Sequence, residues 1–204
     1  MPSLPFVRSN LRWNPFGEPP PEDRASLFVG GLEDWPRFLG SRHPRKFLQF
    51  VGPSGSGKTT RLRELGDRFP ESPLIEWCPI RGWPPLPTPC ASPIFVDDAQ
   101  ELSRKLLGRV VRFRTVAAAT QKNLGSSFAK EGFTVMTVDV EEMMSLCRLR
   151  QFVERRLEWA RRSPGALPRI GVDILADLFR CHGCDLQSIQ SDLYDRYQQL
   201  EGEE

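Results

Sequence analysis

A glycine-rich stretch that contains a lysine and a threonine is the part of the sequence best suited to chemistry. Residues 52–59 read GPSGSGKT and match the phosphate-binding pattern G-x-x-x-x-G-K-[ST]. A loop of this kind directs successive backbone N–H groups at phosphate oxygens, and the N-terminus of the following helix adds a favourable dipole. We expect Lys58 to bind the β- and γ-phosphates of a nucleotide and Thr59 to offer its hydroxyl to Mg²⁺. The residues expected to hold the nucleotide are Gly52, Pro53, Ser54, Gly55, Ser56, Gly57, Lys58, Thr59 and Thr60.

Two consecutive aspartates follow an apolar run further along the chain. Residues 94–98 read IFVDD, which is typical of a buried strand that ends in carboxylates at the edge of a sheet. A carboxylate at the end of a strand beside a phosphate loop can hold the Mg²⁺ that accompanies a nucleotide. We therefore expect Asp97 to share the metal with Thr59, and Asp98 to orient the water that attacks the γ-phosphate.

The next apolar run ends in a threonine. Residues 116–120 read VAAAT, and Gln121 follows them. Ligands of open α/β sheets bind at the carboxyl ends of the strands, so Thr120 is a third candidate, which would contact the γ-phosphate or position water. A strand also ends in a polar residue when the chain simply has to reach solvent, and the sequence leaves both explanations open.

Apolar runs separated by helical patterns or long connections predict the sheet that positions these residues. The expected strands are residues 46–51, 73–80, 94–97, 110–120 and 133–140, and the expected helices between them are residues 59–69 and 100–107. This alternation is typical of an α/β fold with a parallel sheet. It places the phosphate loop between the first strand and the first long helix. A proline-rich connection, residues 79–93, predicts a surface loop or, alternatively, a docking motif for a partner.

Only helical patterns follow residue 140. Apolar residues spaced three to four positions apart predict a helix over 146–160, and two shorter helices follow, the last with Asp185 as its N-cap. Cys181 and Cys184 flank the expected end of the earlier helix, and a zinc site there is an alternative that needs further ligands. The expected domains are an N-terminal arm with a short helix (1–42), a P-loop α/β core (43–140) and a C-terminal helical lid (141–204).

The composition limits the other classes of function. The 204 residues include 28 basic and 26 acidic side chains, a formal net charge of +2, which neither requires nor excludes a nucleic-acid partner. No stretch approaches the ~18 consecutive apolar residues of a membrane span. The N-terminus lacks the apolar segment of a secretory signal, so we expect a cytoplasmic protein. Because the sequence contains only two histidines, a His-rich metal centre or a Ser-His-Asp catalytic triad is not expected.

These motifs together resemble those of AAA+ P-loop ATPases. The resemblance is carried by the phosphate loop, by VDDAQEL at 96–102, by AATQKNL at 118–124 and by the C-terminal helices. The sequence is similar to small bacterial members of the transposition-regulator and secretion-pathway type, which often open with an Asn-Pro-Phe element like that at 14–16. The resemblance implies a sheet of strand order 5-1-4-3-2, with adenine between the N-terminal segment and the lid.

The sequence departs from the AAA+ pattern at two positions. Asp98 stands where the family usually has a longer glutamate, and Gln187 stands where the lid usually presents an arginine to the γ-phosphate. Both changes favour binding over rapid turnover. The resemblance also implies an arginine supplied by another subunit, and Arg155 or Arg156 could provide it, although such a run is also typical of a solvated helical face. The same arginines could contact a nucleic-acid backbone.

The function predicted from these residues is Mg²⁺-dependent ATP binding by an AAA+-like ATPase. Hydrolysis would drive or switch a partner protein, or a second copy of the chain. The alternative is a nucleotide-gated binding module, such as a DNA-linked helper, with little or no hydrolysis. A small-molecule kinase is disfavoured because we find no inserted arginine-rich lid and no acceptor site, and the absence of N-K-x-D favours adenine over guanine.

Overall fold

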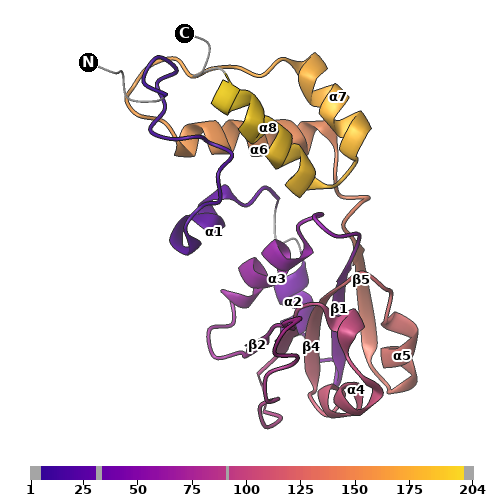
Figure 1. The fold of residues 1–204 in the computed structure, drawn as a ribbon. Helices are drawn as coiled ribbons and strands as arrows, with labels where there is room; N and C mark the ends of the chain where they lie inside the picture. Colours follow the sequence, from indigo (N-terminus) through magenta and orange to yellow (C-terminus); the bar gives the residue numbers. More distant parts are fainter. Residues whose placement is uncertain (1–5, 31–33, 91, 200–204) are drawn as a thin grey trace. The chain divides into compact units, whose positions relative to one another are not determined.

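The chain folds into two compact units, each of which has its own core. The computed structural model describes residues 6–30, 34–90 and 92–199. The first unit, which we call the helical unit, combines residues 1–30 with residues 144–204, and the second, the α/β unit, comprises residues 31–143. The N-terminal segment therefore joins the C-terminal helices rather than the sheet that follows it in the sequence (Figure 1).

The α/β unit contains one five-stranded parallel sheet. Its strands are β1 (Lys46–Val51), β2 (Leu74–Ile75), β3 (Ile94–Val96), β4 (Thr115–Thr120) and β5 (Thr134–Asp139). The strand order is β2-β3-β4-β1-β5, and every pairing is parallel. Read from the opposite edge, this is the order 5-1-4-3-2 implied by the AAA+ resemblance, so the expected fold class is confirmed.

Helices cover both faces of this sheet, because the buried strands present apolar side chains on each face. The helices are α2 (Trp35–Gly40), α3 (Lys58–Gly66), α4 (Arg104–Val110) and α5 (Gly125–Lys130). Leu48 and Phe50 of β1 pack in one core cluster with Leu62 of α3. Phe47, on the opposite face, stacks on Phe128 of α5 with ring centroids 3.6 Å apart. The two clusters make the sheet the middle layer of three.

Two predicted strands are shorter than expected. The run 110–120 begins as the end of a helix, because Val110 closes α4 and Phe113 packs into the core from the turn that follows. Both side chains are fully buried, so their apolar character reflects core packing of a connection rather than strand pairing. The run 73–80 pairs only at Leu74–Ile75, because the chain then turns through a Cys78–Gly82 bridge.

The helix expected at 100–107 is displaced and divided. A 3₁₀ turn, η2 (Ala99–Glu101), follows β3, and α4 begins only after Ser103. The Ser103 hydroxyl accepts a hydrogen bond from the Leu106 N–H, which is the usual way in which serine caps a helix N-terminus. Capping at this position explains why the helix begins later than its apolar spacing indicates.

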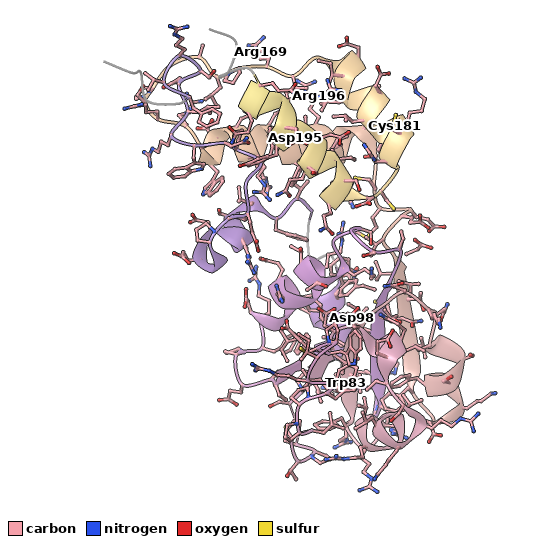
Figure 2. All side chains as sticks on the ribbon, in the orientation of Figure 1. Trp83, Asp98, Arg169, Cys181, Asp195 and Arg196 are labelled. Atoms are coloured by element: carbon pink, nitrogen blue, oxygen red, sulfur yellow. The ribbon has the colours of Figure 1, made fainter. Side chains whose placement is uncertain are left out.

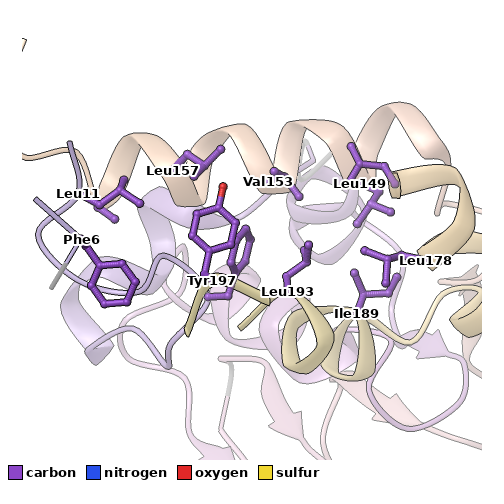
Figure 3. Close-up of a cluster of buried hydrophobic side chains, with 12 residues drawn as sticks. Phe6, Leu11, Leu149, Val153, Leu157, Leu178, Ile189, Leu193 and Tyr197 are labelled. Carbon is purple, nitrogen blue, oxygen red and sulfur yellow. The ribbon is translucent and has the colours of Figure 1, made fainter. Parts of the chain in front are cut away.

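The helical unit is built from three helices and the N-terminal segment. Its elements are η1 (Pro21–Asp23), α1 (Arg24–Leu27), α6 (Leu146–Trp159), α7 (Val172–His182) and α8 (Leu186–Gln199). Apolar residues of all three long helices form one buried cluster (Figure 3). Phe6 and Leu11 belong to the same cluster, so the N-terminal segment is part of this core. Each such buried side chain contributes about 1.5–3 kcal/mol relative to exposure.

The ends of these helices follow the predicted capping residues. Asp185 accepts hydrogen bonds from the N–H groups of Gln187 and Ser188, each 3.1 Å long, and so caps α8. Gly183 follows α7, and its positive φ of 59° suits glycine. None of the helices in the described parts of the chain has the length and apolar character that crossing a bilayer requires.

Candidate functional site

The glycine-rich loop leaves β1 at Val51 and leads directly into α3. The Gly52 N–H donates to the Thr120 carbonyl over 3.3 Å, which ties the start of the loop to the end of β4. Gly55 and Gly57 have φ values of 75° and 83°, in the left-handed region that other residues rarely adopt. These two glycines allow the chain to make the tight turn that precedes the helix N-terminus, as the sequence pattern predicts.

The polar side chains of this loop fold back onto its own backbone. Lys58 is 7% exposed, and its Nζ donates to the Pro53 carbonyl over 2.5 Å. Ser56 Oγ donates to the same carbonyl over 2.9 Å. Arg61, which lies outside the sequence motif, donates to the carbonyls of Ser56 and Gly57. The loop is therefore supported by buried donors, and the ammonium group of Lys58 is held beside it.

Thr59 and Asp97 meet at the end of this loop. The Thr59 hydroxyl donates to Asp97 Oδ1 over 3.1 Å, although the two residues are 38 positions apart. Asp97 is held in place by its backbone N–H, which donates to the Ile75 carbonyl of the neighbouring strand. Burial raises the pKa of the Asp97 carboxyl, the Thr59 hydrogen bond opposes this, and the nearby carboxylates of Asp98 and Glu76 raise it further. A divalent cation at this place would relieve that cost.

Asp98 is held at the same edge of the sheet by a neighbouring glutamine. It adopts a left-handed conformation with φ of 50°, and its side chain is labelled in Figure 2. Gln100 Nε2 donates to Asp98 Oδ1 over 2.9 Å, while Gln100 Oε1 accepts from the Gln121 N–H over 3.0 Å. Gln100 thus links the ends of β3 and β4, a role that spacing alone did not indicate.

Thr120 lies at the end of β4 with its hydroxyl already engaged. The side chain is fully buried. Its Oγ1 donates to the Lys122 carbonyl and accepts from the Lys122 N–H. This pair of hydrogen bonds shapes the turn after β4, so direct contact between Thr120 and a phosphate would require the turn to open. Gln121, the next residue, is exposed.

A buried glutamine on β1 supports the loop that follows β4. Gln49 is 0% exposed, and its Nε2 donates to Asn123 Oδ1 and to Thr137 Oγ1 over 2.6 and 2.8 Å. Its Oε1 accepts from the Leu124 N–H over 2.8 Å. A Cβ on Gly125 would lie 2.9 Å from Asn123 Oδ1 and 3.0 Å from Gln49 Nε2, so a larger residue there would have to displace these hydrogen-bonded side chains. Gln49 lies inside an apolar run, so its residue type and spacing gave no signal of this role.

The candidate residues of the C-terminal region lie in the helical unit. Arg156 is 6% exposed and donates to the Gly17 carbonyl and to Gln190 Oε1 over 2.8 and 3.0 Å. Burial lowers the pKa of Arg156 to about 10. Arg155 is exposed and donates to the Phe28 carbonyl. Gln187 is exposed in the first turn of α8. The Arg156 guanidinium is therefore buried and hydrogen-bonded within the core of the helical unit.

The acidic groups at the sheet edge are too few to hold a metal by themselves. Among the residues that the structure describes, no three His, Cys, Asp or Glu side chains come together as metal ligands. Magnesium in nucleotide sites is commonly held by one or two protein oxygens, phosphate oxygens and water. The oxygens of Thr59 and Asp97 fit that requirement, whereas a metal site independent of a nucleotide does not fit the described residues.

Comparisons with known proteins identify the class of fold. Residues of this chain superpose on domain III of the replication initiation protein DnaA from Thermotoga maritima with a TM-score of 0.53 and 14% identity, over 92% of this chain and 93% of that domain. NtrX from Brucella abortus is similar over 90% of this chain with a TM-score of 0.51 and 14% identity. The match covers 54% of NtrX, so this chain spans about half of its length.

These likenesses support an AAA+ P-loop fold, and at this level of identity they concern the fold alone. No protein-family model matches the sequence, and no curated protein matches it either.

Proposed function

We propose that this protein binds ATP with Mg²⁺ in the glycine-rich loop and acts as an AAA+-like ATPase whose nucleotide state drives or switches a partner. The observation that carries the proposal is the meeting of Thr59 and Asp97, 3.1 Å apart, at the end of a loop shaped by two left-handed glycines. Such a pair of oxygens beside a phosphate loop is the arrangement that holds a nucleotide-bound cation.

Each residue has a defined part in this proposal. Backbone N–H groups of residues 52–60 and the Lys58 ammonium would bind the phosphates, and Thr59 and Asp97 would hold Mg²⁺. Bound Mg²⁺ would supply positive charge at the β- and γ-phosphates. Asp98 would accept a hydrogen bond from the attacking water, whose oxygen bonds to the γ-phosphorus as the bond to the bridging oxygen of ADP breaks. Thr120 would contribute indirectly, because its hydroxyl holds the turn after β4 through Lys122.

A nucleotide-gated module with little hydrolysis is the second candidate, and one contact favours it. Asp98 Oδ1 accepts a hydrogen bond from Gln100, and aspartate is one methylene shorter than glutamate. This hydrogen bond occupies one carboxylate oxygen, so Asp98 would have to orient water chiefly through Oδ2, from a side chain that reaches less far than glutamate. Nucleotide binding does not depend on that step, so binding would persist where turnover is slow.

A nucleotide titration tests the proposal. We expect the wild-type chain to bind fluorescent ATP in the presence of Mg²⁺, and Lys58→Ala to weaken binding by about 10- to 100-fold, because a charge-assisted contact is lost. Lys130→Ala is the matched control, since Lys130 is an exposed lysine at the end of α5. Failure of the wild type to bind, or equal binding by Lys58→Ala, would contradict the proposal.

Phosphate release then separates the two candidates. An ATPase should release phosphate at saturating ATP, and Asp98→Asn should lower the rate by about 100-fold or more while binding is retained. Release at the background rate, with ATP bound and displaceable, would instead support the gated module.

A further inference from the structure

A basic hollow in the helical unit is separate from the glycine-rich loop. It has a volume of about 510 Å³ and is lined by Arg12, Arg161, Arg162, Ser163, Pro164 and Gly165. Three of its six lining residues are arginines, contributed by the N-terminal segment and by the loop after α6. This concentration of positive charge contrasts with the near-neutral charge of the whole chain.

Two of these arginines are available to a ligand. Arg12 and Arg162 are both exposed, and within the described residues neither guanidinium donates a hydrogen bond or joins an ion pair. Arg161 differs, because its guanidinium is paired with Glu158 at 2.7 Å and also donates to the Gly165 carbonyl. Arg161 therefore helps to shape the loop, whereas Arg12 and Arg162 present uncompensated charge at the hollow. A guanidinium is suited to phosphate because of its planar set of donors.

Asn10 also helps to hold the loop that carries Arg162 in place. Asn10 adopts a left-handed conformation with φ of 55°. Its Nδ2 donates to the carbonyls of Ser163 and Ala166 over 2.9 and 3.3 Å, and its Oδ1 accepts from the N–H and hydroxyl of Ser163 over 3.2 and 2.8 Å. The Arg162 N–H donates to the Asn10 carbonyl over 2.9 Å. The hollow is thus organised before any ligand binds, which lowers the entropic cost of binding.

An exposed aromatic ring stands next to these charges. Trp13 is 40% exposed, and the Arg12 guanidinium lies 5.9 Å from its ring centroid. Trp159 supports it from within the unit, with ring centroids 5.1 Å apart. Trp159 is in turn fixed by a hydrogen bond from its Nε1 to Asp23 Oδ2, 2.9 Å long. Sites for single-stranded nucleic acid combine positive charge along the backbone with aromatic rings on which bases stack.

We infer that this surface, made of Arg12, Trp13 and Arg162, binds single-stranded nucleic acid through its phosphates and one stacked base. The inference does not rest on the proposed ATPase function, because none of these residues belongs to the glycine-rich loop. Duplex DNA, an acidic peptide and an anionic lipid surface share the charge of the ligand. None of them offers an unstacked base to Trp13, and this difference decides the test.

The experiment measures the anisotropy of a fluorescein-labelled oligothymidine of about 20 nucleotides with the full chain, without ATP, at about 50 and about 200 mM salt. The wild type should bind at the lower salt. Arg12→Ala/Arg162→Ala should bind at least about tenfold more weakly, and the slope of log affinity against log salt should fall by about 1.4, the value for two phosphate contacts on a single strand. Trp13→Ala should weaken binding by about fivefold or more, and Trp13→Phe should retain most of it.

The matched control is Arg104→Ala/Lys105→Ala on α4, which removes the same charge from exposed positions outside this surface. It should bind like the wild type, and thermal unfolding checks that every variant is folded. Equal losses in both double variants, or no binding by the wild type, would overturn the inference. The inference would also be overturned if duplex DNA, polyglutamate or phosphatidylserine vesicles bound more strongly than the oligothymidine in an arginine-dependent way. Full binding by Trp13→Ala would overturn it too. Loss of ATP binding in Lys58→Ala with unchanged oligothymidine binding would show that the two sites are separate.

Discussion

In the α/β unit, the buried polar side chains at the carboxyl edge of the sheet position loops, whereas in the helical unit they hold the N-terminal segment against the helices. Gln49 and Asp97 are examples of the first kind, since each orders backbone or side chains around the glycine-rich loop or the loop after β4. Asn14 and Arg156 are examples of the second, because their partners are carbonyls and a glutamine within the helical core.

This difference shows that burial of a polar group does not by itself indicate a functional site. A buried polar group must be hydrogen-bonded in either case, because an unsatisfied one is costly. The sheet edge differs because its polar groups lie beside the tight turn made by Gly55 and Gly57, which leads into the N-terminus of α3. Arg156, by contrast, is enclosed by its own unit.

The largest effect on stability is expected from Arg156→Ala. The substitution leaves the Gly17 carbonyl and the Gln190 side chain without their donor, which should lower the free energy of unfolding of the helical unit by about 2–4 kcal/mol. Hydrogen exchange followed by mass spectrometry should show faster exchange in α6 and α8, and unchanged exchange in β1 and β4. Arg155→Ala, at the exposed neighbouring position, should change stability by less than about 0.5 kcal/mol. Equal effects of the two variants would contradict the structural role of Arg156.

A smaller effect, confined to the α/β unit, is expected from Gln49→Leu. The partly buried Leu124 N–H would lose its acceptor and the exposed Thr137 hydroxyl would lose its donor, and the buried Gln49 position would no longer hold the loop, at a cost of about 2 kcal/mol. Exchange should accelerate in the loop after β4 and leave α6 and α8 unchanged. Gln151→Leu, on the exposed side of α6, is the control and should be close to neutral. Unchanged exchange after β4 would show that Gln49 does not support that loop.

The smallest effect is a pH dependence that arises at Asp97. Burial raises the pKa of this carboxyl in the folded chain, so at pH values between its unfolded and folded pKa the folded state binds more protons. The free energy of unfolding contributed by Asp97 therefore falls as pH rises through that range. Asp97→Asn keeps an oxygen acceptor for Thr59 and removes the charge.

Without nucleotide and Mg²⁺, Asp97→Asn should melt at a higher temperature than the wild type at neutral pH. The difference should shrink as the pH falls below the folded pKa of Asp97. A series of thermal unfolding measurements between about pH 4 and pH 8 checks this prediction. A difference independent of pH, or a lower melting temperature of the variant at neutral pH, would contradict it.

Much of the α/β unit could be predicted because its signals are local. The apolar runs that became β1 and β3, and the loop between β1 and α3, were read from residues adjacent in the sequence. The strand order followed from the AAA+ resemblance and is confirmed. The run 110–120 was predicted too long because Val110 and Phe113 are apolar for core packing outside the strand, and the run 73–80 because the chain turns at the Cys78–Gly82 bridge. The roles of Lys58, Asp97, Asp98 and Thr120 toward a ligand stay predictions.

Local spacing thus determined the glycine-rich loop, the main strands and the three C-terminal helices, since each of these depends on residues a few positions apart. The tertiary structure alone decided which distant side chains complete each unit. The Asn14 side chain donates to the Tyr194 carbonyl 180 positions away, Asn10 holds a loop 153 positions away, and Gln49 meets Leu124 across 75 positions. Hydrogen bonds of this kind leave no periodic pattern in the sequence, because the fold brings their partners together only after both units have packed.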